Sequence, residues 1–167
     1  MMELGWEVVV QAFCVAVFFA VLALRVFAYA TADGAEPTYL GTWKVATAAP
    51  APWAVPQRAP DAAERARLIG QTIAVKAAVI TGPSPFACPG PHYRFRDFTP
   101  AMLFQGAFEE MQANDKSADP DRLAGALGFI GPSIKTLETG CDLEFHFVDA
   151  STAQVGLNDT IYTLRKQ

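Results

Sequence analysis

Residues 39–45 read Tyr39-Leu40-Gly41-Thr42-Trp43-Lys44-Val45. This stretch is typical of the opening strand of a small β-domain. The chain has 167 residues, of which 51% are hydrophobic and 18% are charged. This length is sufficient for one hydrophobic core and too short for two domains of ordinary size. We therefore expect one compact domain over residues 39–167.

The amino-terminal residues 1–32 form a second, distinct part of the sequence. All but one of residues 8–24 are apolar or small, and a helix of that length spans roughly 25 Å, slightly under the ~30 Å core of a bilayer. The small-x-small sites Ala28-Tyr29-Ala30 and Ala30-Thr31-Ala32 follow, as in a cleaved signal peptide. Two acids before the apolar run and Arg25 after it disagree with a cleaved signal, because by the positive-inside rule this asymmetry would hold the carboxyl side in the cytoplasm. An uncleaved membrane anchor is the second interpretation. A buried soluble helix is the third interpretation.

Cys88 and Cys141 are an even pair outside the amino-terminal segment. If joined, they close a loop of about 54 residues, which is worth roughly 4 kcal/mol by loop entropy. A disulfide requires an oxidising compartment, whereas two independent buried thiols would carry no such information. Together with the export segment, the pair predicts a periplasmic or extracellular protein, anchored through residues 8–24 if these are not removed.

Alternating apolar and polar residues predict an antiparallel, mainly β fold. Capping and proline signals predict two short helices, over 60–69 and 119–127, and a loop over 109–118. With the opening strand at 42–48, strands are expected at 72–80, 92–96, 102–108, 134–138, 141–148, 154–157 and 160–165. Eight strands are enough to close a barrel around side chains or one small ligand. We expect an eight-stranded antiparallel barrel with two short helices, preceded by an amino-terminal hydrophobic helix.

The motif Gly41-x-Trp43, with Arg165 in the last expected strand, resembles the signature of the lipocalins and other calycins. The stretch Leu40-Gly41-Thr42-Trp43-Lys44 also looks like the strand openings of META-type small exported bacterial domains. The resemblance implies that Trp43 packs across the closed end of a barrel and that Arg165 stacks on it. Such a cation–indole contact is worth about 0.5 to 2 kcal/mol. The proline-rich segment 49–56 departs from the usual lipocalin hairpin.

The sequence offers little for catalysis. The net charge of -4 does not suit a nucleic-acid partner. His92 and His146 are the only histidines, and neither lies in a nucleophile–base–acid motif or in a set of zinc ligands. We therefore predict no catalytic residue, no metal site and no cofactor. Alternation places His146 on a polar, solvated face and His92 at a loop edge, and an enzyme would need the two to converge with acids.

Aromatic and basic side chains remain as candidates for binding. Four phenylalanines fall on expected inward faces, where they either line a cavity for an apolar ligand or fill the barrel: Phe95, Phe104, Phe145 and Phe147. Three residues are candidates for surface recognition, although they would equally suit a solvated face: His92, Arg94 and Arg96.

These observations predict a non-catalytic exported binding protein that takes a small apolar ligand in, or at the mouth of, a β-barrel. The first alternative is a periplasmic protein–protein module, such as an enzyme inhibitor or an accessory of envelope assembly. A hydrolase or metal enzyme using His92 and His146 is the remaining alternative. A barrel filled by its own side chains would favour the protein–protein module.

Overall fold

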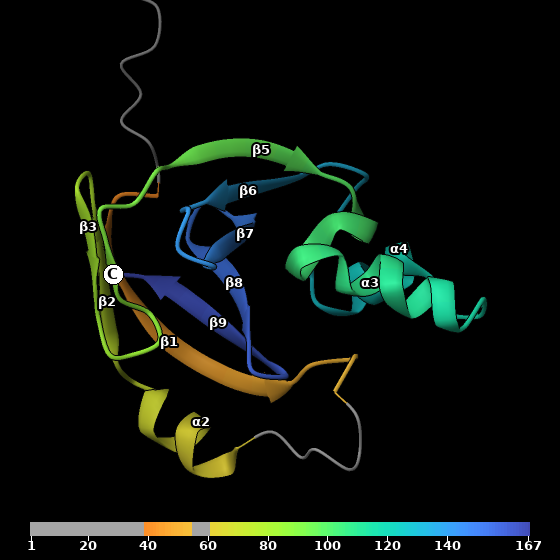
Figure 1. Ribbon diagram of the computed structural model, residues 1–167, viewed down its shortest axis with the longest axis horizontal. Coiled ribbons are helices and arrows are strands. Elements are labelled where there is room, and N and C mark those ends of the chain that lie inside the picture. Colours follow the sequence, from red (N-terminus) through yellow and green to blue (C-terminus); the bar gives the residue numbers. More distant parts are fainter. Residues whose placement is uncertain (1–38, 55–60) are drawn as a thin grey trace, which may run out of the picture. The chain divides into compact units, whose positions relative to one another are not determined.

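A computed structural model describes residues 39–54 and 61–167, and these described residues form one compact unit. The mainly β fold is confirmed (Figure 1). The helix expected within residues 1–32 lies outside the described residues. Within the described ranges, no helix is long and apolar enough to cross a membrane.

One antiparallel sheet of nine strands makes up most of the described chain, and it curls into a half-barrel (Figure 1). Its order is β4-β3-β2-β1-β9-β8-β7-β6-β5. The first and last strands therefore pair in the middle, and β4 and β5 are the edges. The strands are β1 (Gly41–Pro50), β2 (Thr72–Lys76), β3 (Val79–Thr81), β4 (Cys88–Pro89), β5 (Arg94–Phe98), β6 (Ile134–Glu138), β7 (Glu144–Asp149), β8 (Thr152–Leu157) and β9 (Thr160–Lys166).

The sheet differs from the expected closed barrel of eight strands in two respects. The strand expected over 72–80 is a hairpin, because a turn at residues 77–78 separates β2 from β3. No strand pairing joins β4 to β5 in the described part of the chain, so the sheet stays open between its edges.

Within the described residues, three short helices accompany the sheet: α2 (Ala62–Leu68), α3 (Leu103–Asn114) and α4 (Pro120–Ala126), with a 3₁₀ turn at Pro100–Met102 before α3. The two expected helices, α2 and α4, are confirmed. The Asp61 carboxylate caps α2 by accepting hydrogen bonds from two backbone amides of its first turn. Asp119 caps α4, which has Pro120 at its first position.

The α3 helix corrects the sequence prediction, which placed a strand at 102–108 and a loop at 109–118. Three successive residues in α3, Phe104, Gln105 and Gly106, have positive φ angles of 53°, 61° and 82°. Only glycine adopts this region without strain. The chain therefore makes a left-handed turn here, which local alternation of apolar residues does not reveal.

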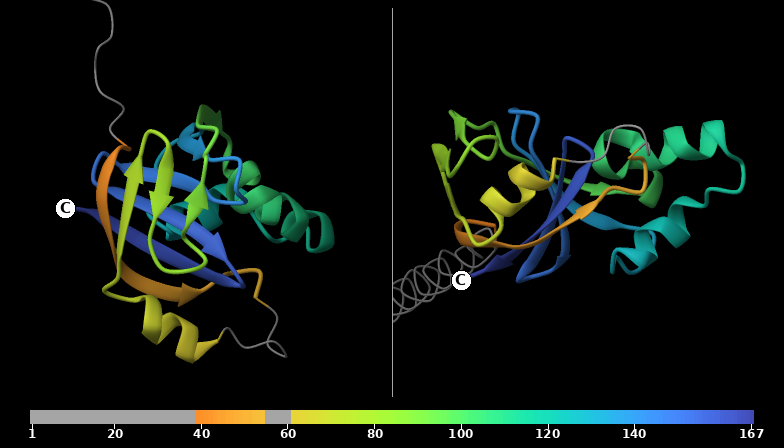
Figure 2. Two further views of the ribbon diagram at one scale, coloured as in Figure 1. Left: turned by 60° about the vertical axis from the view of Figure 1, so that its left-hand side comes forward. Right: turned by 90° about the horizontal axis from the view of Figure 1, so that it is seen from below.

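The half-barrel is filled on its concave face by its own side chains. The largest fully buried residues of this core are Trp43, Tyr162, Phe86, Phe145, Leu68 and Ile73. A second core lies between the convex face of the sheet and the helices α3 and α4, which lie together away from α2 (Figures 1 and 2). It is built around Leu103, Phe104, Phe108, Phe129 and Ile161. Both faces of the β6–β9 region are therefore covered.

The expected disulfide is confirmed. Cys88 in β4 is bonded to Cys141 in the turn between β6 and β7, and their Cα atoms are 5.9 Å apart. The bond links one edge strand of the curled sheet to the far half of the same sheet. A disulfide is compatible with an exported protein.

Trp43 is 1% exposed and lies in the concave core, where its Nε1 donates a hydrogen bond of 2.8 Å to the Tyr39 carbonyl. The cation over its ring is Lys166, whose Nζ lies 5.7 Å from the ring centroid, and not Arg165 as the resemblance implied. Lys166 is directly opposite Trp43 in the β1–β9 register and shares a face with it. Arg165, one residue earlier, points to the other face and donates a hydrogen bond to Thr152.

Candidate functional site

An apolar groove of about 540 Å³ opens at the mouth of the half-barrel. We call it the mouth groove, and its main lining residues are Phe95, Phe129, Ile130, Lys135, Phe147 and Val148. Ile130 is 93% exposed and Phe95 is 47% exposed. Large apolar side chains at such exposure, gathered around one hollow, are typical of an interaction site.

The register of the sheet and the position of β5 explain why the Phe95 side chain is exposed. Phe95, Leu137 and Phe145 lie directly opposite one another across β5, β6 and β7, on the concave face. Leu137 and Phe145 are buried because they have strands on both sides, whereas β5 is an edge strand. The Phe95 ring therefore has only partial cover, from Phe147 at 5.8 Å and Tyr39 at 5.2 Å between ring centroids.

Ile130 is held outward by its neighbours in the loop between α4 and β6. Phe129 is 5% exposed and belongs to the second core, so it anchors the loop. Gly128 and Gly131 have φ angles of 93° and 86°, which allow the tight path on either side. The sequence prediction missed Phe129 and Ile130. Two large apolar residues between glycines, next to a proline, were the signal that could have found them.

The four phenylalanines predicted to face inward do not form one site. Phe95 and Phe147 both line the mouth groove. Phe145 is 1% exposed and fills the concave core. Phe104 lies in α3 and belongs to the second core, where its ring packs so closely on β8 that a Cβ on Gly156 would be 2.9 Å from it. The prediction for Phe104 was wrong because its segment is not a strand.

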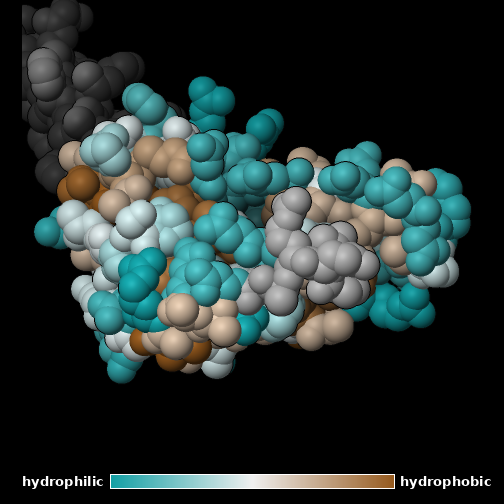
Figure 3. Space-filling view, turned by 60° about the horizontal axis from the view of Figure 1, so that its bottom comes forward, coloured by the Kyte–Doolittle hydropathy of each residue, from teal (hydrophilic) through white to brown (hydrophobic). Residues whose placement is uncertain are grey.

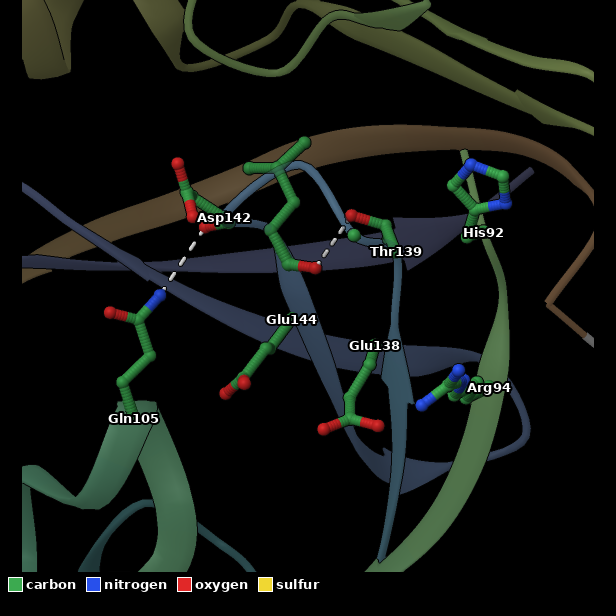
Figure 4. Close-up of a pocket in the computed structure, with 9 residues that line it drawn as sticks. His92, Arg94, Gln105, Glu138, Thr139, Asp142 and Glu144 are labelled. Atoms are coloured by element: carbon green, nitrogen blue, oxygen red, sulfur yellow. Dashed lines mark hydrogen bonds between the residues drawn. The ribbon is translucent and has the colours of Figure 1, made fainter. Parts of the chain in front are cut away.

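A polar pocket of about 570 Å³ lies on the convex face of the sheet (Figure 4). Its lining includes His92, Arg94, Gln105, Glu138, Asp142 and Glu144. Arg94, Glu138 and Glu144 are directly opposite one another across β5, β6 and β7. The surface candidates His92, Arg94 and Arg96 are all exposed, and the first two reach this pocket. Arg96 forms an ion pair of 3.6 Å with Glu138.

Glu144 lies deepest among the acids of the polar pocket, with its side chain 20% exposed. Burial raises the pKa of its carboxyl, and the nearby Glu138 charge acts in the same direction, while a hydrogen bond from the Gln105 backbone amide opposes both. Its Oε2 atom is buried and accepts no hydrogen bond.

His146 is 0% exposed, so the prediction of a solvated histidine was wrong. Helix α3 covers the convex face at this point, and the Phe104 backbone amide donates a hydrogen bond of 3.0 Å to His146 Nε2. The other ring nitrogen, Nδ1, is 2.9 Å from Thr136 Oγ1. Because Nε2 accepts a bond, we assign the proton of the neutral ring to Nδ1. Both ring nitrogens are engaged, and the side chain holds the left-handed turn in place.

Burial lowers the pKa of His146 to about 3. Glu144 Oε2, at 3.6 Å from Nε2, would favour a charged ring. Desolvation prevails because the ring is enclosed and Nε2 already accepts a bond from an amide that cannot reverse its role. His146 is also not among the residues that line the polar pocket with His92.

We expect acid to destabilise the fold through His146. An unfolded histidine binds a proton below a pKa of 6.5, whereas His146 in the folded protein binds one only near pH 3. Stability is therefore lost as the pH falls through this window. The loss should be about 2 to 3 kcal/mol between pH 7 and pH 4.5, and urea denaturation at several pH values measures it.

The variant His146→Gln should lose most of this pH dependence, whereas His92→Gln, which changes an exposed histidine, should keep it. The raised pKa of Glu144 has the opposite sign, because its carboxyl takes up a proton more readily in the folded protein. Both variants keep Glu144, so its contribution cancels when the pH dependences of their stabilities are compared. Equal slopes in wild type and His146→Gln would show that the buried imidazole does not control acid stability.

Neither a protein family, a curated protein nor a solved structure was found to match the chain. The lipocalin-like assignment therefore stays a prediction. In the part of the chain that the structure describes, no group of three or more His, Cys, Asp or Glu side chains is placed to hold a metal ion.

Proposed function

We propose that this chain is a non-catalytic binding module of the cell envelope, and that it binds a partner protein at the mouth groove. The observation that carries the proposal is the exposure of Ile130 and Phe95 around one groove, in a domain whose interior is filled by its own core. A filled interior leaves the rim as the place for binding. The disulfide and the apolar amino-terminal segment, interpreted as a signal or an anchor, support an oxidising location outside the cytoplasm.

A small apolar molecule is the second candidate ligand for the same groove. The volume of about 540 Å³ and the aromatic side chains Phe95 and Phe147 favour it, since pockets for small ligands are usually concave and apolar. Native mass spectrometry of the purified chain distinguishes the two candidates. A co-purified lipid would support the small ligand, and its absence would favour the protein partner.

Binding of an apolar probe, 1-anilinonaphthalene-8-sulfonate, tests the groove itself. We expect the wild-type chain to enhance the dye's fluorescence and the variants Ile130→Ser and Phe95→Ser each to weaken binding at least about fivefold, as expected for loss of roughly 1 kcal/mol. Ile69→Ser is the matched control, because Ile69 is 44% exposed but lies next to α2 and outside the groove. If all three variants lose binding equally, or wild type does not bind, the mouth groove is not the site.

A further inference from the structure

Strand β5 has a free edge beside the mouth groove. It pairs with β6 over Arg94–Phe98, and no other described strand pairs with its second side. Four of its five residues are exposed. An unpaired edge presents backbone N–H and C=O groups that can add a strand from another chain. The groove and the edge share Phe95, so one extended segment could use both.

The side chains of β5 alternate in charge and polarity. Arg94 and Arg96 project from the convex face, and Phe95 and Asp97 from the concave face. Asp97 forms an exposed ion pair with Lys135, whose Nζ lies 2.8 Å from Asp97 Oδ1. The free edge therefore offers a positive charge, an apolar ring and a second positive charge in succession.

The two arginines are exposed on the free edge, although Glu138 is directly opposite Arg94 across β5 and β6. Arg94 makes no hydrogen bond or ion pair with the residues that the structure describes. Arg96 reaches Glu138 at 3.6 Å, but its side chain is 58% exposed. Exposed ion pairs at this separation contribute little. A carboxylate on an added strand would approach each guanidinium from the free edge of β5, on the side away from β6.

A second copy of this chain is a poor occupant of the edge. In an antiparallel pair of two β5 strands, residues directly opposite each other lie on the same face of the sheet. Every such alignment that pairs at least three residues of each strand therefore places an arginine opposite an arginine, or Asp97 opposite Asp97. Like charges directly opposite each other destabilise a sheet. The charge pattern therefore favours a segment of different composition.

We propose that the free edge of β5 binds an extended segment of a partner protein in which an apolar residue is flanked on both sides by acidic residues. The apolar side chain lies beside Phe95 at the rim of the mouth groove, and the two acids face Arg94 and Arg96. This inference rests on the proposed function, because it names the kind of partner that the groove would bind.

Binding of synthetic peptides to the full chain tests the inference. The probe is a labelled heptapeptide, Thr-Val-Glu-Leu-Glu-Val-Thr, and the comparison peptides replace both Glu by Lys or carry N-methyl groups on alternate residues of the same sequence. Fluorescence anisotropy should show that the acidic peptide binds at least about tenfold more tightly than either. Amide hydrogen exchange should slow within residues 94–98 when the acidic peptide is bound.

The double variant Arg94→Gln/Arg96→Gln should abolish the preference for the acidic peptide. The double variant Lys44→Gln/Arg67→Gln removes the same charge from residues outside β5 and should keep the preference. Circular dichroism checks that both variants fold. Equal binding of the Glu and Lys peptides would overturn the acidic partner, and equal binding of the N-methylated peptide would overturn strand addition.

The dye assay on Ile130→Ser separates these failures from failure of the proposed function. If the dye binds the groove but peptide binding shows no dependence on charge or on N-methylation, only the strand-addition inference is wrong. If neither dye nor peptide binds, the proposed function is wrong as well.

Discussion

Replacing Trp43 by alanine is expected to lower the free energy of unfolding by about 3 to 5 kcal/mol, the range for large-to-small changes in a core. Trp43 is 1% exposed, and its ring centroid lies 6.0 Å from that of Phe147. The change leaves a cavity and also removes the donor to the Tyr39 carbonyl. Chemical denaturation of wild type and variant, monitored by circular dichroism, measures the loss.

Two further variants show where the loss comes from. Trp43→Phe retains an aromatic ring and loses the indole N–H, so it should cost clearly less than the alanine change. Ile69→Ala changes an apolar residue that is 44% exposed and should cost under about 1 kcal/mol. If Trp43→Ala also costs less than about 1 kcal/mol, Trp43 does not hold the two sides of the concave core together.

The sequence predicted those elements whose signals are local. The cap at Asp119 predicted the start of α4, because a carboxylate accepts bonds from the first amides of a helix. Acids in the first turn and bases in the last turn predicted α2, although Asp61 caps this helix and does not lie within it. Strict alternation over 141–148 identified β7, and it also placed Phe145 and His146 on opposite faces, as the structure has them. In each case, neighbours in sequence decide the conformation.

The left-handed turn that begins α3 could not be predicted in this way. It depends on a hydrogen bond from the Phe104 amide to His146, 42 residues later in the chain. The same contact explains the error about His146. Alternation showed correctly that it faces away from Phe145, but only the tertiary fold shows that α3 covers that face.

The candidate site was predicted only in part for the same reason. Phe95 and Phe147 were identified as apolar residues of the inner face, and both border the mouth groove. Their exposure follows from the position of β5 at an edge, which depends on strand order and cannot be read from alternation. Ile130 joins them only because Phe129 is anchored in the second core.

Removing the disulfide is the second change with a large expected effect. The loop between Cys88 and Cys141 has about 54 residues, so its closure restricts the unfolded chain by roughly 4 kcal/mol on the loop-entropy estimate. The bond also spans the opening of the half-barrel, since β4 and β5 share no strand pairing in the described residues. Besides the disulfide, aromatic contacts bridge the two halves here, such as Tyr39 with Tyr93 at 5.1 Å.

The double variant Cys88→Ser/Cys141→Ser should therefore lose about 2 to 4 kcal/mol of unfolding free energy. Reduction of the wild type should lower the denaturation midpoint to a similar extent, and the intact mass should rise by two hydrogens. In the double variant, no disulfide remains within the described domain. A reductant should therefore leave the denaturation midpoint of this variant unchanged. A loss below about 1 kcal/mol would mean that hydrogen bonds and the concave core alone hold the open sheet curled. The disulfide would then indicate an oxidising compartment but would not stabilise the fold.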